Sequence, residues 1–282
     1  MAKMIFGLLT TLMFTALNAS ALPLPKGKVP AALPPTFTDS YNFEGIVALD
    51  NCSGSLVRLE SSKDTDYAMV LTNGHCYEGG FPDPGTFVSN VASDRTFSLY
   101  NSSAQTVARL TATKVLYSTM TKTDMTLYLL SSTYADILRN YNIHPFTLAS
   151  THPTVGMNID VISGYWKRGY SCSIEAFVPT LKEDVFTSND SLRYSRPGCE
   201  VIGGTSGSPA VLKGTKTIVG VNNTINEDGE ECTMDNPCEV DANGNITYHE
   251  GYGYAQETYW IYSCLNASNQ LDVTVPGCQL FH

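Results

Sequence analysis

The chain has 282 residues, 43% of them hydrophobic, and its 27 acidic and 17 basic residues give a formal net charge of −10 at pH 7. Such a charge repels phosphate groups, so we expect neither nucleic acid nor an anionic membrane surface as a partner. The hydrophobic fraction is ample for a packed core, and the length fits one large β domain or two small domains.

The first 21 residues have the pattern of a secretory signal peptide. Lys3 precedes an apolar run at 5–17, and the small residues at 19–21 suit cleavage after Ala21. The run is too short to span a bilayer, and no later segment has the roughly 20 apolar residues that a spanning helix needs. We therefore predict a soluble, secreted protein, either extracellular or periplasmic.

Residues 22–40 are rich in proline and lack a hydrophobic period, which predicts an extended pro-segment or linker. From Tyr41 onward, short runs of β-branched and aromatic residues alternate with Gly, Asn, Asp and Ser, as is typical of strands and turns. Strands are predicted at 46–49, 55–59, 69–72, 86–88, 96–100, 107–110, 114–117 and 126–130, and then at 159–162, 172–177, 184–187, 210–212, 217–221 and 251–256. One short helix is predicted at 133–140, where Ser131 or Ser132 could cap it. This pattern favours an all-β sandwich or a pair of barrels.

The cysteines after the signal are even in number, which in an exported chain favours disulfides over metal ligands. They are Cys52, Cys76, Cys172, Cys199, Cys232, Cys238, Cys264 and Cys278. Sequence alone leaves the connectivity open, although local pairing of Cys232 with Cys238 and of Cys264 with Cys278 is economical. A loose metal knuckle at Cys232 and Cys238 is the alternative, but no second pair at zinc-finger spacing accompanies it.

Three residues in separate segments could act together in catalysis. His75 follows an apolar strand, Asp124 directly precedes one, and Ser206 lies between glycines on a sharp turn at 203–209. Each has an ordinary structural alternative: a hydrogen-bonding histidine, a strand-capping aspartate and a polar turn. A serine hydroxyl, however, needs a histidine to accept its proton and an acid to orient the imidazole. The three residue types therefore make a consistent set for nucleophilic catalysis.

In the order of these segments, the chain resembles the trypsin-like (chymotrypsin-fold) serine peptidases over residues 41–282. The resemblance rests on Cys-Ser-Gly-Ser-Leu at 52–56, Leu-Thr-Asn-Gly-His-Cys at 71–76, Asp-Met-Thr-Leu at 124–127, Ser-Gly-Tyr-Trp at 163–166 and Gly-Thr-Ser-Gly-Ser-Pro at 204–209. The last segment is closer to secreted glutamyl-endopeptidase-like and other bacterial-type members than to the animal digestive enzymes.

The resemblance implies two six-stranded antiparallel β-barrels, at about 41–150 and 151–282, with the active site between them. It implies that Ser206 attacks the scissile peptide bond, that His75 is general base and then general acid, and that Asp124 orients the imidazole. The backbone N–H groups of Gly204 and Ser206 would form the oxyanion hole. A Cys52–Cys76 disulfide would bracket the histidine loop. We expect a monomer that acts on proteins or peptides without a metal or other cofactor.

One departure from the animal enzymes concerns activation. Thr205 stands where those zymogens have an aspartate that pairs with a newly freed N-terminal amine, and an Ile-Val-Gly-Gly start is missing. We therefore hypothesise that the oxyanion loop forms without such a buried ion pair.

Substrate preference is less constrained, and Glu200 and Asn223 are the substrate-binding candidates. Glu200 lies six residues before Ser206, where the family has the base of the P1 pocket, and a carboxylate there would favour Lys or Arg at P1. An exposed or arginine-paired glutamate is the alternative, with Arg193 or Arg196 as partner. The glutamyl-endopeptidase-like branch would favour an acidic P1 residue, but the strand that holds Asn223 has no histidine to bind one.

Two other functional classes stay open. A catalytically inactive protease-fold binding protein would use its acidic loops as an interaction surface, but it would need none of the three catalytic candidates. A calcium-dependent secreted β module is supported by the segment at 241–247, which resembles part of a calcium loop but lacks the closing glutamate. A solvated, disulfide-stapled acidic loop is the competing interpretation of residues 227–250.

Overall fold

The computed structural model describes residues 41–282. The predicted signal peptide (1–21) and the predicted pro-segment or linker (22–40) lie outside the described residues. The described part consists mainly of β strands, as predicted, together with two short helices.

The first barrel is formed by strands between residues 46 and 133. They are β1 (Ile46–Ala48), β2 (Ser53–Arg58), β3 (Tyr67–Thr72), β5 (Thr96–Tyr100), β6 (Thr106–Thr119) and β8 (Met125–Thr133). These six strands pair antiparallel in the closed order β1-β2-β3-β8-β6-β5-β1. Side chains that alternate along the strands fill the interior, among them the fully buried Val47, Leu56, Val70, Leu99 and Tyr128.

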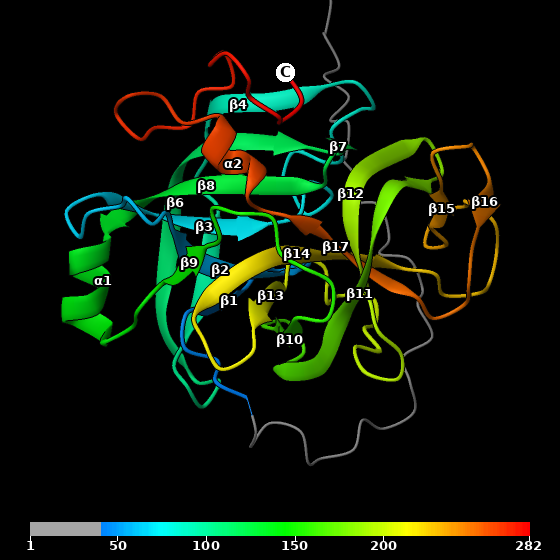
Figure 1. Cartoon of the computed structure of the whole chain (residues 1–282). Coiled ribbons are helices and arrows are strands. Elements are labelled where there is room, and N and C mark those ends of the chain that lie inside the picture. Colours follow the sequence, from blue (N-terminus) through cyan, green and yellow to red (C-terminus); the bar gives the residue numbers. More distant parts are fainter. Residues whose placement is uncertain (1–40) are drawn as a thin grey trace, which may run out of the picture. The chain divides into compact units, whose positions relative to one another are not determined.

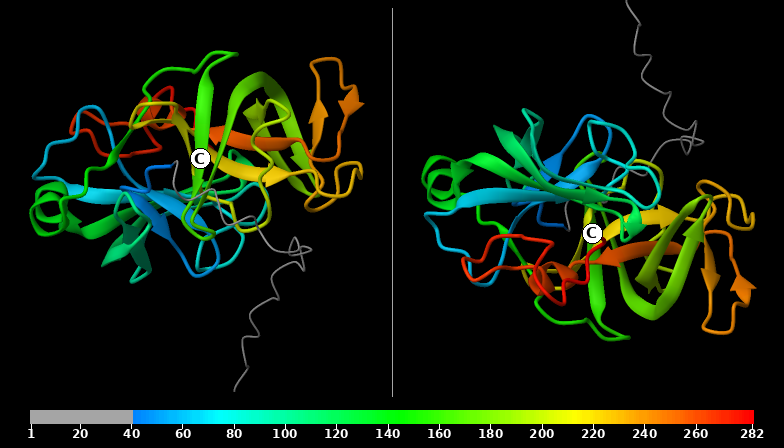
Figure 2. Two further views of the ribbon diagram at one scale, coloured as in Figure 1. Left: turned by 90° about the horizontal axis from the view of Figure 1, so that it is seen from below. Right: turned by 90° about the horizontal axis from the view of Figure 1, so that it is seen from above.

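The second barrel repeats this closure between residues 158 and 257. Its strands are β10 (Asn158–Ser163), β11 (Arg168–Glu183), β12 (Phe186–Tyr194), β13 (Pro209–Leu212), β14 (Thr217–Ile225) and β17 (Gly253–Glu257). They pair antiparallel in the closed order β10-β11-β12-β17-β14-β13-β10. The expected fold of two six-stranded antiparallel barrels is confirmed. Figures 1 and 2 show the blue-to-green strands of the first barrel grouped apart from the later strands of the second.

Five short strands supplement the barrels. They are β4 (Phe87–Ala92), β7 (Thr121–Lys122), β9 (Phe146–Leu148), β15 (Cys238–Val240) and β16 (Ile246–Thr247). β9 pairs in parallel with β2 of the first barrel and with β14 of the second, and β7 pairs in parallel with β12. β15 extends the sheet beside β11, which brings the acidic 227–250 segment against the second barrel.

Several element boundaries differ from the sequence prediction for local reasons. The strands predicted at 107–110 and 114–117 are one strand, β6, whose register with β8 shifts between Ala112 and Lys114, as a β-bulge requires. The helix α1 (Tyr134–Tyr141) is capped by Thr133 and not by Ser131 or Ser132, because Thr133 and Asp136 form a reciprocal capping box. The segment predicted as a strand at 184–187 begins with a turn, and β12 starts only at Phe186.

The C-terminal segment packs on the first barrel, although it follows the second in sequence. It begins with the short helix α2 (Trp260–Ser263). Trp260 and Ile261 are buried in a hydrophobic cluster that contains residues of both barrels. The Tyr117 hydroxyl of β6 donates a hydrogen bond to the Phe281 carbonyl at 2.8 Å. This segment therefore covers the first barrel with apolar surface.

The eight cysteines form four disulfides, and no described cysteine is free. The pairs are Cys52–Cys76, Cys172–Cys199, Cys232–Cys238 and Cys264–Cys278. The two local pairs and the bracket around the histidine loop agree with the sequence prediction. Because Cys232 and Cys238 are bonded to each other, they have no thiolates with which to bind a metal.

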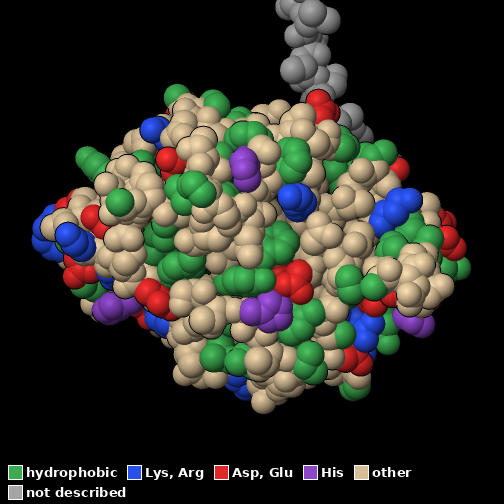
Figure 3. Space-filling view, turned by 45° about the horizontal axis from the view of Figure 1, so that its top comes forward, with side chains coloured by type: hydrophobic (Ala, Val, Ile, Leu, Met, Phe, Trp, Pro, Cys, Tyr) green, Lys and Arg blue, Asp and Glu red, His purple; other side chains and the backbone are tan. Residues whose placement is uncertain are grey.

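Acidic, basic and hydrophobic side chains are interspersed on the face seen in Figure 3. Within residues 41–282, no helix has the length and the apolar character that crossing a membrane requires.

Candidate active site

His75 and Asp124 are joined by two hydrogen bonds at one end of the first barrel. His75 follows β3 and Asp124 precedes β8, and these two strands pair with each other. Asp124 Oδ2 lies 2.6 Å from His75 Nδ1, and Asp124 Oδ1 accepts a hydrogen bond from the His75 backbone N–H at 3.0 Å. The carboxylate thus holds a proton on Nδ1 and leaves Nε2 of the ring as the basic nitrogen.

The local charges change the proton affinity of His75. Burial opposes a charged imidazole, but the carboxylate of Asp124 outweighs this effect, so the pKa of His75 is raised above its ordinary value. Glu183 and Asp235 act in the same direction from the opposite side of the pocket.

Asn73 links this pair to the segment that carries Ser206. It is fully buried, and its side-chain amide donates a hydrogen bond to the Asp124 carbonyl at 2.8 Å. Its Oδ1 accepts a hydrogen bond from the Gly207 N–H at 2.5 Å. One side chain of the first barrel therefore contacts the residue after Ser206 directly.

Ser206 lies on a sharp turn that only glycine permits at the next position. Gly207 has φ +80°, and a Cβ there would clash with the Ser53 carbonyl and the Thr72 hydroxyl. The turn is fixed to the first barrel by a hydrogen bond of 2.8 Å from the Ser53 N–H to the Ser206 carbonyl.

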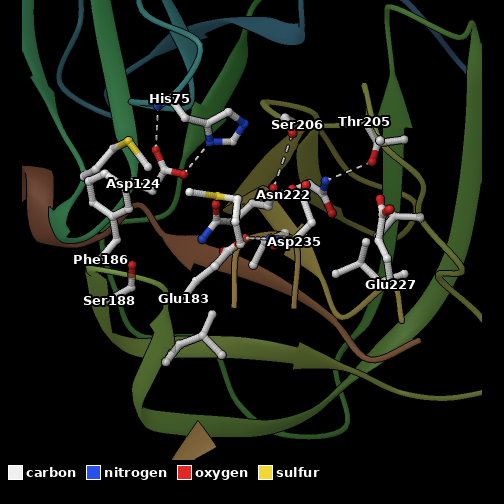
Figure 4. A pocket seen from close by; sticks show the side chains of 18 of the residues that line it. His75, Asp124, Glu183, Phe186, Ser188, Thr205, Ser206, Asn222, Glu227 and Asp235 are labelled. Atoms are coloured by element: carbon white, nitrogen blue, oxygen red, sulfur yellow. Dashed lines mark hydrogen bonds and ion pairs between the residues drawn. The ribbon is translucent and has the colours of Figure 1, made fainter. Parts of the chain in front are cut away.

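The Ser206 hydroxyl and the imidazole of His75 line the same pocket (Figure 4). The hydroxyl donates a hydrogen bond to the Asn223 carbonyl at 3.4 Å, and within residues 41–282 it has no hydrogen bond to His75. Asn223 itself lines the pocket from β14. The structure thus brings together four of the predicted site residues, namely His75, Asp124, Ser206 and Asn223.

The two amides predicted for the oxyanion hole are available. Gly204 has φ +86°, a conformation that favours glycine. Within the described residues, neither the Gly204 N–H nor the Ser206 N–H donates a hydrogen bond to another group. Both donors therefore lack a protein partner; Ser206 lines the pocket, whereas Gly204 lies between the lining residues Gly203 and Thr205 without lining it itself.

The pocket has an acidic lining without lysine or arginine among its described members. Besides Asp124, its carboxylates belong to Glu183, Glu227 and Asp235. Burial raises the pKa of Glu183 to about 7, and burial followed by neighbouring carboxylates raises the pKa of Glu227. Burial also raises the pKa of Asp235, although His75 opposes this shift. The apolar side chains of Leu181, Phe186, Ile225 and Met234 lie among them.

Glu200 is not part of this lining. Its side chain is exposed, and it lies next to the Cys172–Cys199 disulfide. The predicted arginine partners are bound elsewhere: Arg193 pairs with Glu175 and Glu239, and Arg196 donates a hydrogen bond to the Glu250 carbonyl. The position of Glu200 therefore corresponds to the exposed alternative and not to the base of the pocket.

Sequence reasoning missed Asn73, Glu183, Glu227 and Asp235 as members of the site. Asn73 belongs to the segment that identified His75, but nothing in the sequence indicates that its side chain bonds both Asp124 and Gly207. Glu183 and Asp235 come from two different segments, and the Asp235 N–H donates a hydrogen bond to Glu183 at 2.8 Å. No local sequence pattern predicts that contact.

The carboxylate of Asp241, the first residue of the predicted calcium-loop fragment, is hydrogen-bonded to residues of its own turn. It accepts hydrogen bonds from the N–H groups of Asn243 and Asn245, each at 2.8 Å. Among the described residues, the one group with metal-ligand spacing is Cys52, His75 and Cys76, whose two sulfurs are bonded to each other.

Comparison with protein families agrees with this geometry. The family model described as Trypsin matches residues 41–243, which is more than half of the chain. The chain belongs to the trypsin family. This family of serine proteases has the fold predicted from the sequence motifs. No curated protein sequence matches the chain.

Solved structures of proteases from this fold are similar at low identity. The Nocardiopsis protease NAPase shares 15% identity, with 76% of this chain and 91% of that chain covered and a TM-score of 0.43. The MamO protease domain from Magnetospirillum magneticum shares 14% identity, with 81% and 99% covered and a TM-score of 0.48. A glutamic-acid-specific serine protease, described as using a histidine triad in substrate binding, shares 15% identity, with 76% and 91% covered and a TM-score of 0.40.

Proposed function

We propose that this member of the trypsin family is a secreted serine endopeptidase that hydrolyses peptide bonds through an acyl-enzyme on Ser206. One observation carries the proposal: the hydrogen-bonded pair of His75 and Asp124 lines the same pocket as Ser206. A binding protein needs no basic imidazole in the same pocket as a serine on a sharp turn. An acyl-transfer enzyme needs all three groups.

In the first half of the reaction, the Ser206 oxygen attacks the scissile carbonyl carbon while His75 Nε2 takes the hydroxyl proton. Asp124 keeps Nδ1 protonated and stabilises the imidazolium that forms. The C–N bond then breaks, the leaving amine receives the proton from His75, and an ester with Ser206 remains. In the second half, His75 takes a proton from water and the water oxygen attacks the ester carbon. The bond between that carbon and the Ser206 oxygen breaks, His75 returns the proton to Ser206, and the carboxylic acid product leaves.

The negative charge on the tetrahedral oxygen requires fixed donors. The N–H groups of Gly204 and Ser206 fill this role in the proposal, because both lack other partners in the described residues. Removal of one such donor costs about 2.7–4 kcal/mol of transition-state stabilisation in a related case.

Secretion is supported by the cysteine chemistry. All eight cysteines are in disulfides, and such bonds form and persist in oxidising compartments outside the cytosol. The signal pattern of residues 1–21 agrees with export.

A fluorophosphonate probe tests the proposed nucleophile. The wild type should be labelled at one site, and the label should disappear in Ser206→Ala. Ser208→Ala is a matched control, because Ser208 is fully buried on the same loop and its hydroxyl has no hydrogen-bond partner in the described residues. Labelling should persist in this control.

The same experiment separates the competing functions. A folded wild type that takes no label and cleaves no casein or peptide library would favour the inactive binding protein. A melting temperature that rises on addition of calcium, without labelling, would favour the calcium-dependent module.

A further inference from the structure

Two successive carbonyl groups before Ser206 are each held by a side-chain donor. The indole N–H of Trp166 donates a hydrogen bond to the Gly203 carbonyl at 2.8 Å. The Thr205 hydroxyl donates one to the Ile202 carbonyl at 2.5 Å, and the same carbonyl accepts the Thr205 N–H at 3.0 Å. These bonds fix the orientation of the two peptide groups that lead to Gly204.

The bond from Trp166 has a consequence for the Gly204 amide. In a trans peptide, the carbonyl and the N–H point in opposite directions. Because the Gly203 carbonyl points to the indole, the Gly204 N–H points away from it. That N–H belongs to the same peptide group, and it is one of the two free donors described above. Trp166 therefore opposes a flip that would replace the donor with a carbonyl.

Trp166 is itself held in place by contacts within the second barrel and across to the first. Its backbone N–H donates a hydrogen bond to the Ser163 hydroxyl at 3.2 Å, and that hydroxyl lies 3.0 Å from the Ser53 hydroxyl. The ring of Tyr165 packs edge-on against the indole, with the centroids 4.9 Å apart. The backbone of Trp166 is thus fixed, and its half-buried indole packs against Tyr165 where its N–H reaches the Gly203 carbonyl.

Thr205 is held by a buried relay of neutral groups. The side-chain amide of Asn222 donates a hydrogen bond to the Thr205 hydroxyl at 3.2 Å, and the Tyr194 hydroxyl donates one to Asn222 Oδ1 at 3.0 Å. Thr205, Asn222 and Tyr194 are all at most 2% exposed. In such an apolar interior, fully satisfied hydrogen bonds are strong and hold one geometry.

We propose that Trp166 and Thr205 are positioning residues that set the oxyanion hole, with Asn222 and Tyr194 supporting Thr205. The proposal rests on the proposed peptidase function and adds to it the groups that hold the loop. Neutral hydrogen bonds to the Ile202 and Gly203 carbonyls hold the loop in the conformation that a buried ion pair stabilises in the animal enzymes. The loop is then formed as soon as the chain folds.

Two variants test the positioning role through kinetics. Trp166→Phe keeps most of the ring but removes the indole donor, and Thr205→Val keeps the shape but removes the hydroxyl. Each should lower kcat about 10- to 100-fold, with KM changed less than about threefold, because the lost bond matters most when the oxyanion forms. Affinity for a peptide boronic acid, which forms a tetrahedral adduct with the serine, should fall by a similar factor.

Two further variants serve as controls. Thr205→Ser retains a hydroxyl and should restore kcat to within about threefold of the wild type. Trp260→Phe changes the other tryptophan, which is buried in a cluster with first-barrel residues, and should leave kcat unchanged even where it lowers the melting temperature.

A second readout does not depend on activity. Amide hydrogen exchange of peptides that cover residues 202–206 should be faster in Trp166→Phe and Thr205→Val than in the wild type. If the wild type cleaves no peptide but the variants still exchange faster, the peptidase proposal fails and the positioning role stands. Folded variants with wild-type kcat, boronic-acid affinity and exchange would overturn the positioning role. If Thr205→Val does not fold, Trp166→Phe decides alone.

Discussion

The Ser206 hydroxyl donates its hydrogen bond to the Asn223 carbonyl, 3.4 Å away. Both groups line the pocket that also holds the His75 imidazole (Figure 4). Catalytic hydrogen bonds are often long or misaligned in unliganded enzymes and tighten when substrate binds. We expect a substrate N–H to bind the Asn223 carbonyl, which would release the Ser206 hydroxyl to His75.

The orienting acid gives the first prediction. Asp124→Asn should lower kcat about 10⁴-fold, because an amide no longer holds the proton on His75 Nδ1. Steady-state cleavage of a peptide substrate measures the loss, and circular dichroism verifies the fold. Asp160→Asn is a control, since Asp160 binds the Ser171 hydroxyl and does not line the pocket. A loss of similar size in this control would indicate a general structural effect.

The second prediction concerns pH. His75 must be neutral to act as a base, and its pKa is raised above the ordinary value of 6.5, so kcat/KM should rise with pH through a midpoint above 6.5. Glu183, whose pKa is about 7, contributes to that shift when it is ionised. Glu183→Gln should therefore move the midpoint to lower pH. Glu60→Gln removes an exposed carboxylate outside the pocket and should leave the midpoint in place. An unmoved midpoint in Glu183→Gln would contradict the assignment.

The third prediction concerns the substrate side chain that enters the pocket. A lysine or arginine side chain has an apolar stem and a cationic end, which suits a pocket whose described lining has apolar residues and carboxylates but no lysine or arginine. Glu227→Gln and Asp235→Asn should each lower kcat/KM for such substrates about tenfold relative to neutral ones. Glu200→Gln should leave the preference unchanged, because Glu200 lies outside the pocket.

Cleavage profiling with a peptide library measures this preference. Among the described pocket residues, His75 is the sole histidine, so the pocket offers no further imidazole for an acidic side chain. Preferred cleavage after Glu or Asp would contradict the prediction.

The fourth prediction concerns stability. Glu257 at the end of β17 is fully buried, and neither carboxyl oxygen has a partner in the described residues. Burial, followed by the charge of Asp190, raises the pKa of Glu257 well above its ordinary value of 4.5. The native chain keeps this proton at a pH where the unfolded chain releases it. Stability is therefore full below about pH 4.5 and falls as pH rises toward the native pKa.

Glu257→Gln should remove this pH dependence, because an amide does not titrate. At pH 8 we expect a melting temperature about 2–4 °C above that of the wild type, measured by calorimetry. Glu231→Gln changes an exposed carboxylate and should leave the pH dependence unaltered. A wild type and a Glu257→Gln variant with parallel profiles would rule out the linkage.

The β-rich character of the chain could be predicted from local signals, whereas the two barrels and the set His75, Asp124 and Ser206 were predicted from the order of several motifs that resembles one family. Strands and glycine-rich turns can be recognised from residues that are adjacent in the sequence. The segments that carry the three candidate residues lie at the ends of such strands. The pocket wall was not predictable from such signals. Glu183 lies at the end of β11, and Asp235 lies inside the Cys232–Cys238 loop. They meet because β11 pairs with β15, so that Lys182 is opposite Cys238, a register that only the folded chain specifies.

The sequence left two alternatives open for Glu200, and its exposed side chain corresponds to the second of them. The pocket-base alternative counted six residues back from Ser206, but the path of the chain between Cys199 and Ser206 depends on the Cys172–Cys199 disulfide and on the burial of Val201 in the second-barrel core. The number of residues between Glu200 and Ser206 does not determine whether the Glu200 side chain faces the pocket.

Asn73 bonds the Asp124 carbonyl on one side and the Gly207 N–H on the other. Sliding of one barrel along the other would stretch the bond to Gly207, which joins the His75–Asp124 pair to the loop of Ser206. Under mild denaturant or pressure, enzymatic turnover should therefore vanish while the circular dichroism of both barrels is still intact. Loss of activity would then report misalignment of the barrels before either barrel unfolds.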